Sequence, residues 1–171
     1  MMPTIAAARP HAPHALGIVR RIVGWLDRIP YGAIALLARF SIAAVFWRSG
    51  QTKVQGLSVD LVHLKFGWGW PTLRESAVAL FRDEYRVPLL PPELAALAAA
   101  SAEHLFPMLL LLGLATRLSA LGLLVVTAVI QVFVYPDAYP IHGTWAALLL
   151  LLIARGPGAL SVDRWIDRRL R

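Results

Sequence analysis

Cysteine is absent from this sequence of 171 residues. The chain therefore forms no disulfide, offers no thiolate to a metal ion and carries no redox-active thiol of its own. Charge is also scarce, because only 16% of the residues are charged, and the 10 acidic residues are outnumbered by 17 basic ones. Any redox activity would need a borrowed cofactor.

The familiar motifs of soluble enzymes are missing as well. The sequence contains no HExxH, no GxGxxG, no P-loop and no nucleophile elbow, which argues against zinc hydrolases, nucleotide-binding enzymes and serine hydrolases. The net charge of +7 does not indicate nucleic acid, because the arginines flank apolar runs and form no basic stripe along a polar helix. No nucleic-acid partner is expected.

What the chain has in excess is apolar residues, at 58% with a mean hydropathy of +0.62. Such a chain has to bury its surface in lipid. A span takes about 20 residues, so four spans with their connections nearly use up the length. The sequence predicts an all-α, four-helix transmembrane bundle in contact with the lipid bilayer, with spans at about 29–48, 92–115, 117–135 and 140–154.

Three segments lie outside these spans. Residues 1–28 are expected to be partly disordered or amphipathic, with a helix from Ile18 to Leu26, and residues 156–171 to form an amphipathic tail. The membrane domain itself runs over 29–155. Its long first loop is predicted to contain one interfacial helix, which the pattern Thr72-x-x-Glu75 would begin as a capping box.

The distribution of basic residues predicts the orientation. Both ends of the chain and the turn at Arg117 are basic, whereas the short loop between the third and fourth spans has no basic residue. Short basic segments remain in the cytoplasm. The six basic residues of the first loop argue for the opposite orientation, but this loop is long and also contains acidic residues. We expect a multi-pass protein of the bacterial cytoplasmic (inner) membrane with cytoplasmic N and C termini.

Charged side chains within the spans are the first candidate site. Arg39, Glu103 and Thr127 are expected at similar depths, about 13 to 17 Å from the outer surface, so they are predicted to form one polar layer with His104. An unpaired charge at that depth is costly, which predicts an Arg39–Glu103 ion pair. The pair would either act with His104 as a proton relay or polar cavity floor, or only fix how the helices pair.

A second layer is expected nearer the outer surface. Trp47, Ser49, Gln131 and His142 are the candidates for an outward-facing cavity. Haem is disfavoured because His104 and His142 differ in depth by about 15 Å, too far for two ligands of one iron. No metal site is predicted, and a quinone stays open as a cofactor.

The chain resembles the DoxX family of small four-helix membrane proteins over most of residues 30 to 165. The stretches that carry the resemblance are ARFSIAAVFWRSGQTK (38–53), LFRDEYRVPLLPPELAA (80–96), EHLFPMLLLLGLATRLSAL (103–121), VIQVFVYP (129–136), and HGTWAALLLLL with RGPGALSVD (within 142–163). The resemblance implies links to quinone-coupled sulfur oxidation, to redox-stress complexes, or to gene clusters for copper-related modified peptides; the second stretch is most similar to the last of these.

From the residues and the resemblance together we expect an accessory or scaffold subunit of a membrane redox or metal-stress system, with a protein partner or a homo-oligomer, and not a stand-alone enzyme. One alternative is a quinone-interacting oxidoreductase subunit that uses the outer cavity. A second alternative is a small solute transporter or channel, which the absence of an inverted repeat disfavours.

Overall fold

The computed structural model describes residues 14–60 and 64–170, and it divides the chain into two units. The first unit, Met1–Pro30, contains helix α1 (His14–Leu26). Ile18, Ile22 and Trp25 of α1 are exposed apolar side chains that alternate with arginines, as in a helix that lies on a membrane surface. The helix expected from Ile18 is present and begins earlier, at His14.

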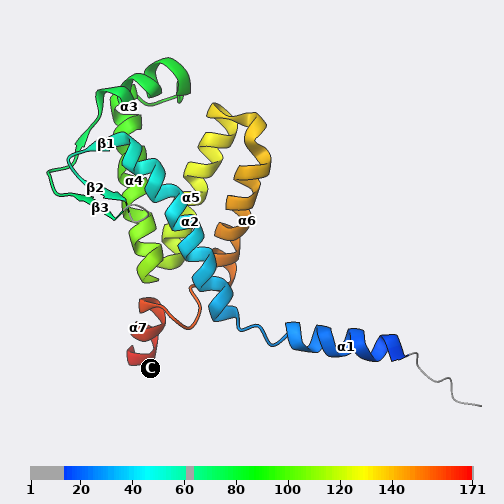
Figure 1. The fold of residues 1–171 in the computed structure, drawn as a ribbon. Coiled ribbons are helices and arrows are strands. Elements are labelled where there is room, and N and C mark those ends of the chain that lie inside the picture. The colour runs from blue at the N-terminus through cyan, green and yellow to red at the C-terminus, as the bar shows by residue number, and fades with distance from the viewer. Residues whose placement is uncertain (1–13, 61–63, 171) are drawn as a thin grey trace, which may run out of the picture. The chain divides into compact units, whose positions relative to one another are not determined.

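The second unit, Tyr31–Arg171, contains four helices long and apolar enough to cross a membrane, which confirms the predicted four-span bundle (Figure 1). The 3-10 helix η3 (Pro136–Ala138) leads into the fourth span, and the π-helix η2 (Ile130–Val134) ends the third. The spans are formed by α2 (Tyr31–Lys53), α4 (Pro92–Leu112), α5 (Thr116–Val129) with η2, and η3 with α6 (Tyr139–Arg155).

Two span boundaries differ from those expected. The first span continues past residue 48 to Lys53, because its last polar side chains find partners on α4 instead of marking the exit from the membrane. The fourth span is longer than expected, at 20 residues, because Pro136 and Pro140 occupy first turns of helix, where proline loses no hydrogen bond.

The helices pack in a ring. α2 contacts α4 and α6, and α5 contacts the same two helices. Alanines on the buried face of α2 let its backbone approach the neighbours closely, as is common between membrane helices. The buried core consists of Ala35, Ala38, Ile42, Ala43 and Phe46 of α2, Leu110 of α4, Ala120 and Leu123 of α5, and Leu149 and Leu152 of α6.

We call the end of the bundle where α2 finishes and α4 begins the loop end. The first loop adds here two small antiparallel sheets, α3 (Glu75–Leu80) and the π-helix η1 (Phe81–Tyr85). The strands, which the sequence did not predict, are β1 (Val54–Gln55) paired with β4 (Thr72–Leu73), and β2 (Ser58–Asp60) paired with β3 (Lys65–Gly67). The predicted capping box is wrong, because Thr72 lies in β4 and Arg74 precedes the helix without a side-chain cap.

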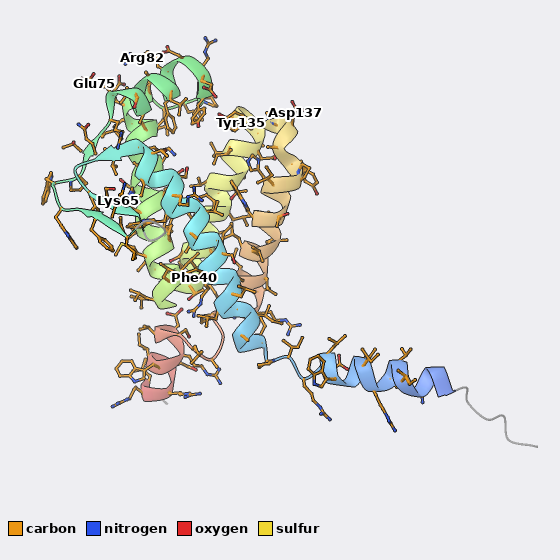
Figure 2. All side chains as sticks on the ribbon, viewed as in Figure 1. Phe40, Lys65, Glu75, Arg82, Tyr135 and Asp137 are labelled. Carbon is orange, nitrogen blue, oxygen red and sulfur yellow. The ribbon has the colours of Figure 1, made fainter. Side chains whose placement is uncertain are left out.

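The loop end is also held to the rest of the bundle by aromatic contacts. Figure 2 shows Glu75, Arg82, Tyr135 and Asp137 at this one end. The Tyr135 hydroxyl donates a 2.6 Å hydrogen bond to Glu84 of η1, and the Tyr135 ring lies 5.7 Å from that of Tyr85. The hydrogen bond to the Glu84 carboxylate is the main reason why the pKa of Tyr135 is raised above its ordinary value.

The opposite end, where α4 and α6 finish, we call the tail end. The chain after Arg155 folds back into it and continues as α7 (Val162–Leu170), below α4 in Figure 1. Asp163 accepts hydrogen bonds from the backbone amides of Ala115 and Thr116, at 2.7 and 2.9 Å, and so caps α5. The Ser161 hydroxyl accepts one from the amide of Arg164 at 3.2 Å. The tail is thereby fixed to the turn between α4 and α5.

Candidate functional site

The helices α2 and α4 approach each other closely at Gly50, near the loop end. A Cβ atom at this position would lie 2.8 Å from Cε1 of His104 and 3.1 Å from Cβ of Glu103. Only glycine leaves room for both side chains between the helices. The sequence around Gly50 therefore brings the polar residues at the end of α2 against the middle of α4.

A buried ion pair lies beside this contact. Nζ of Lys53 is 2.7 Å from Oε2 of Glu103, and the two residues are only 5% and 2% exposed. The Ser49 hydroxyl donates to Oε1 of Glu103 at 3.1 Å and accepts from Lys53 at 3.0 Å. Each carboxylate oxygen thus has a donor, which a buried charge requires.

His104 forms the second half of the cluster. Its Nδ1 lies 2.7 Å from the carbonyl oxygen of Ala100, and its Nε2 lies 2.9 Å from Nε2 of Gln51. The first contact needs the proton on Nδ1, so the neutral ring accepts at Nε2 from the Gln51 amide. The Gln51 side-chain oxygen in turn accepts from the amide of Val59 at 2.8 Å, which links the cluster to β2.

Trp47 closes the cluster on the side of the first loop. Its ring meets the His104 ring edge to face, with centroids 5.0 Å apart, and its indole N–H is 3.5 Å from the carbonyl oxygen of Val59. Trp47 and Ser49, predicted for an outer cavity, therefore lie with Glu103 and His104. We call Trp47, Ser49, Gln51, Lys53, Glu103 and His104 the α2–α4 cluster.

The predicted Arg39–Glu103 ion pair is wrong. Arg39 is 1% exposed, and its Nη2 donates to the carbonyl oxygen of Leu160 at 2.5 Å, at the tail end. Its guanidinium also lies against Gly113, which is about 15 Å further along α4 than Glu103. The prediction failed because it ended the first span too early, so it overlooked Lys53 and placed Arg39 too near the outer surface.

Arg39 is only partly satisfied where it lies. Within residues 14–60 and 64–170, its Nε and Nη1 atoms have no hydrogen-bond partner, and the buried hydroxyls of Thr116 and Ser119 have none either. The Arg39 charge is also attracted by that of Asp163. Arg39 therefore helps to hold the chain that follows α6 against the tail end of the bundle.

Gln131 and His142 meet elsewhere, between η2 and α6. Nδ1 of His142 is 2.8 Å from Oε1 of Gln131, and the Gln131 amide donates to the carbonyl oxygen of Pro136 at 2.6 Å. Both line a cavity of about 130 Å³ together with Thr127. The Thr127 hydroxyl is bound within its own helix, to the carbonyl oxygen of Leu123. We call this cavity, lined by Thr127, Gln131 and His142, the α5–α6 cavity. The residues of the two predicted layers are thus found in three separate places: the α2–α4 cluster, the α5–α6 cavity, and the tail end, where Arg39 lies.

Sequence reasoning missed Lys53 and Gln51. The first span predicted from the sequence ends at residue 48 and so leaves Lys53 outside it, although a lysine with a long apolar stem is able to reach back along a helix to a buried carboxylate. The spacing of Ser49 and Lys53, one helical turn apart, was a usable signal. In the described residues no group of three or more histidine, aspartate or glutamate side chains is arranged to hold a metal ion.

Comparison with known proteins identifies the family. The family model for DoxX matches residues 34–136, which include most of α2, the first loop, α4 and the third span. A protein of Haemophilus influenzae described as an uncharacterized protein is 28% identical over 153 residues, which cover 84% of this chain and 89% of the relative. No solved structure matches the chain. With four apolar spans and a family match over more than half of its length, this chain is a multi-pass membrane protein that belongs to the DoxX family.

Proposed function

We propose that this DoxX protein is an accessory or scaffold subunit of a redox or metal-stress system in the bacterial cytoplasmic membrane. The observation that carries the proposal is that the ionisable side chains of the α2–α4 cluster already have hydrogen-bond partners within the protein. Both oxygens of Glu103 and both ring nitrogens of His104 have partners. A general base needs a lone pair that faces its substrate, whereas each oxygen of Glu103 and each ring nitrogen of His104 already has a partner within the protein, as expected of a contact that holds two helices together.

The first loop supplies a surface for a partner subunit. Phe66, Trp68 and Trp70 are exposed on it, the two tryptophans by 86% and 87%. Exposed aromatic rings are common both at the bilayer interface and at the centre of protein interfaces. The loop is held firmly enough to present these rings, because β1 pairs with β4 and the Arg74 side chain donates to the carbonyl oxygen of Val54 at 2.7 Å.

The charge at the two ends supports an orientation with the tail end in the cytoplasm. Arg117, Arg155 and the arginines of α7 lie at the tail end, and Arg20, Arg21 and Arg28 precede α2. The short connection from η2 to α6 at the loop end has no basic residue. In this proposed orientation the α2–α4 cluster faces the periplasm, as the positive-inside rule favours.

The test asks whether the Lys53–Glu103 pair only holds α2 and α4 together or takes part in a reaction. In a strain that lacks the gene, Lys53→Met/Glu103→Leu should restore growth under copper or oxidant stress and should copurify the same partner as the natural protein. An apolar pair of similar volume often replaces a buried ion pair without loss of stability. Arg48→Met, an exposed change on the same helix, is the control. A double variant that folds and inserts normally but restores no growth would overturn the proposal.

The α5–α6 cavity favours a second candidate, a quinone-interacting subunit. The Gln131 amide has a second N–H that is able to donate to a quinone carbonyl, His142 holds the Gln131 side chain in place, and Trp145 lies 5.0 Å from the His142 ring. The volume of about 130 Å³ is below the roughly 300 Å³ at which small-molecule pockets begin, so the ring would extend into lipid. Purified protein that alters quinol oxidation, with the effect lost in His142→Phe, would favour this function over the scaffold.

A further inference from the structure

A cavity lies at the tail end, at the opposite end of α2 from the α2–α4 cluster. It measures about 680 Å³, within the range of small-ligand pockets. It opens where α5 begins and α6 ends, between these helices, the first turn of α2 and α7. Because both spans end here, the cavity is at the level of the lipid headgroups.

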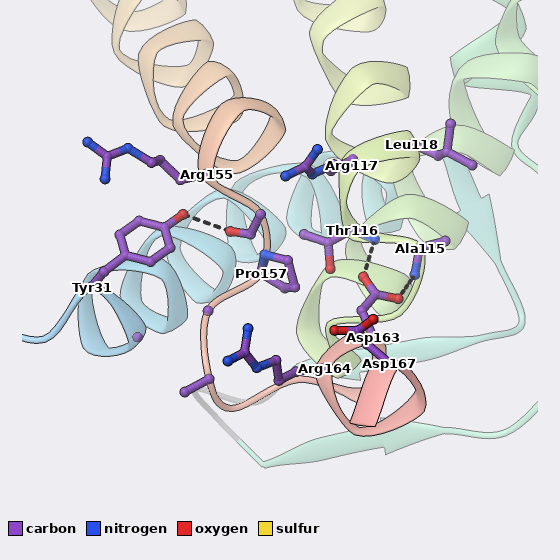
Figure 3. A pocket seen from close by; sticks show the side chains of 14 residues that line it. Tyr31, Ala115, Thr116, Arg117, Leu118, Arg155, Pro157, Asp163, Arg164 and Asp167 are labelled. Atoms are coloured by element: carbon purple, nitrogen blue, oxygen red, sulfur yellow. Dashed lines mark hydrogen bonds between the residues drawn. The ribbon is translucent and has the colours of Figure 1, made fainter. Parts of the chain in front are cut away.

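Arginines dominate the charge of this cavity. Arg117, Arg155 and Arg164 line it, and Figure 3 shows the guanidinium groups of Arg117 and Arg164 on opposite sides of Pro157, with Arg155 pointing outward at the edge. The Arg117 side chain lies over Gly156, where a Cβ atom would be 3.6 Å from Nη2. Within the described ranges, neither Arg117 nor Arg155 has a hydrogen bond or an ion pair from its side chain.

Two carboxylates also line the cavity, but in the part of the chain that the structure describes neither forms an ion pair that would neutralise the charge of Arg117 or Arg155. Both oxygens of Asp163 accept from the amides that begin α5, so its charge is already compensated by backbone donors. Asp167 has an interaction of its own. Thr116 adds a hydroxyl that is fully buried and has no hydrogen-bond partner among the described residues. The cavity therefore combines free cationic donors with an unsatisfied hydroxyl.

We propose that this cavity binds the phosphate group of an anionic membrane lipid, with Arg117 and Arg164 as its ligands. Arginine recognises phosphate through paired N–H donors, and basic pockets at the ends of membrane helices suit anionic headgroups. The surroundings favour a lipid as the source of the phosphate. Leu118, Trp165 and Leu170 are exposed apolar side chains next to the cavity or on α7, where acyl chains would lie.

The test measures lipid retained by the purified full chain in an uncharged detergent, where no charged bilayer surface contributes. Native mass spectrometry after addition of cardiolipin or phosphatidylglycerol should show one lipid bound to the natural protein. Arg117→Gln/Arg164→Gln should bind it about thirtyfold more weakly, since each interfacial arginine contributes roughly fivefold. Arg117→Lys/Arg164→Lys keeps the charge but loses the paired N–H donors, and should recover only part of the binding.

The matched control is Arg168→Gln/Arg169→Gln, which removes the same charge from α7 outside the cavity and should leave lipid retention unchanged. Thermal unfolding without lipid shows that each variant is folded. Inorganic phosphate and phosphatidylcholine are the further probes, and neither should raise the unfolding temperature. If inorganic phosphate raised the unfolding temperature as much as the anionic lipid does, a lipid would not be the source of the bound phosphate group. If the cavity variant and the control variant retained equal amounts of lipid, the site itself would be overturned.

Discussion

Lys53 and Glu103 form a buried ion pair of 2.7 Å between the last residue of α2 and the middle of α4. Removal of one partner leaves the other charge buried, which costs about 3 to 5 kcal/mol. We therefore expect Lys53→Met and Glu103→Leu each to lower the stability of the bundle by this order, and the double variant to recover most of it. Denaturant unfolding in detergent measures all three, and additive losses in the double variant would contradict the pairing.

Gly50 should be the glycine of α2 least tolerant of a side chain. The Cβ of Gly50→Ala would lie 2.8 Å from the His104 ring, so α2 and α4 would have to separate, at a cost of about 1 to 3 kcal/mol. Gly143→Ala in α6 is the matched control, because its Cβ would meet Tyr139 at an ordinary 3.4 Å or more. Melting temperatures of the two variants test this, and equal shifts would count against the close approach.

Arg39 is expected to hold the tail end and not the loop end of the bundle. Arg39→Met fills a similar volume but removes the donor to Leu160. Loss of a hydrogen bond from a charged donor should speed exchange of the Asp163 amide, which donates to Gly113, by about tenfold to a hundredfold. Arg48→Met is the control, and hydrogen exchange followed by mass spectrometry is the measurement. Faster exchange around Glu103 instead would contradict this placement.

The Tyr135 hydroxyl should remain protonated in alkaline solution. Its bond to Glu84 raises its pKa in the folded protein, so this bond stabilises the fold below the ordinary tyrosine pKa of about 10 and is lost as pH rises through the raised value. In ultraviolet titration, the difference between the natural protein and Tyr135→Phe should show little tyrosinate at pH values where free tyrosine ionises. Glu84→Gln should restore ionisation nearer the ordinary value.

The sequence was sufficient to predict the four spans because lipid imposes a simple requirement of about 20 apolar residues for each. Helix ends were harder. The sequence predicts that the first span ends at residue 48, and only the partner of Lys53 on another helix shows that this span continues. The strands of the first loop are two or three residues long, and their pairing over up to 18 intervening residues has no local signature.

The residues of the candidate site could be predicted from the sequence only in part. Glu103 and His104 were recognised as polar residues within a span, and Ser49 and Trp47 as residues of the outer half. Which side chains meet depends on the relative heights of the helices, and sequence fixes neither tilt nor register. Arg39 was therefore assigned to Glu103, although the chain that returns after Arg155 supplies its partner.

The return of the tail also constrains how the protein is made. Arg39 is inserted with the first span, but the Leu160 carbonyl that binds it is synthesised 121 residues later. Until then a nascent chain in the translocon holds a cation without its native acceptor, and water or lipid phosphate has to solvate it. Correct assembly of the first helix is thus completed only after the last span has been inserted.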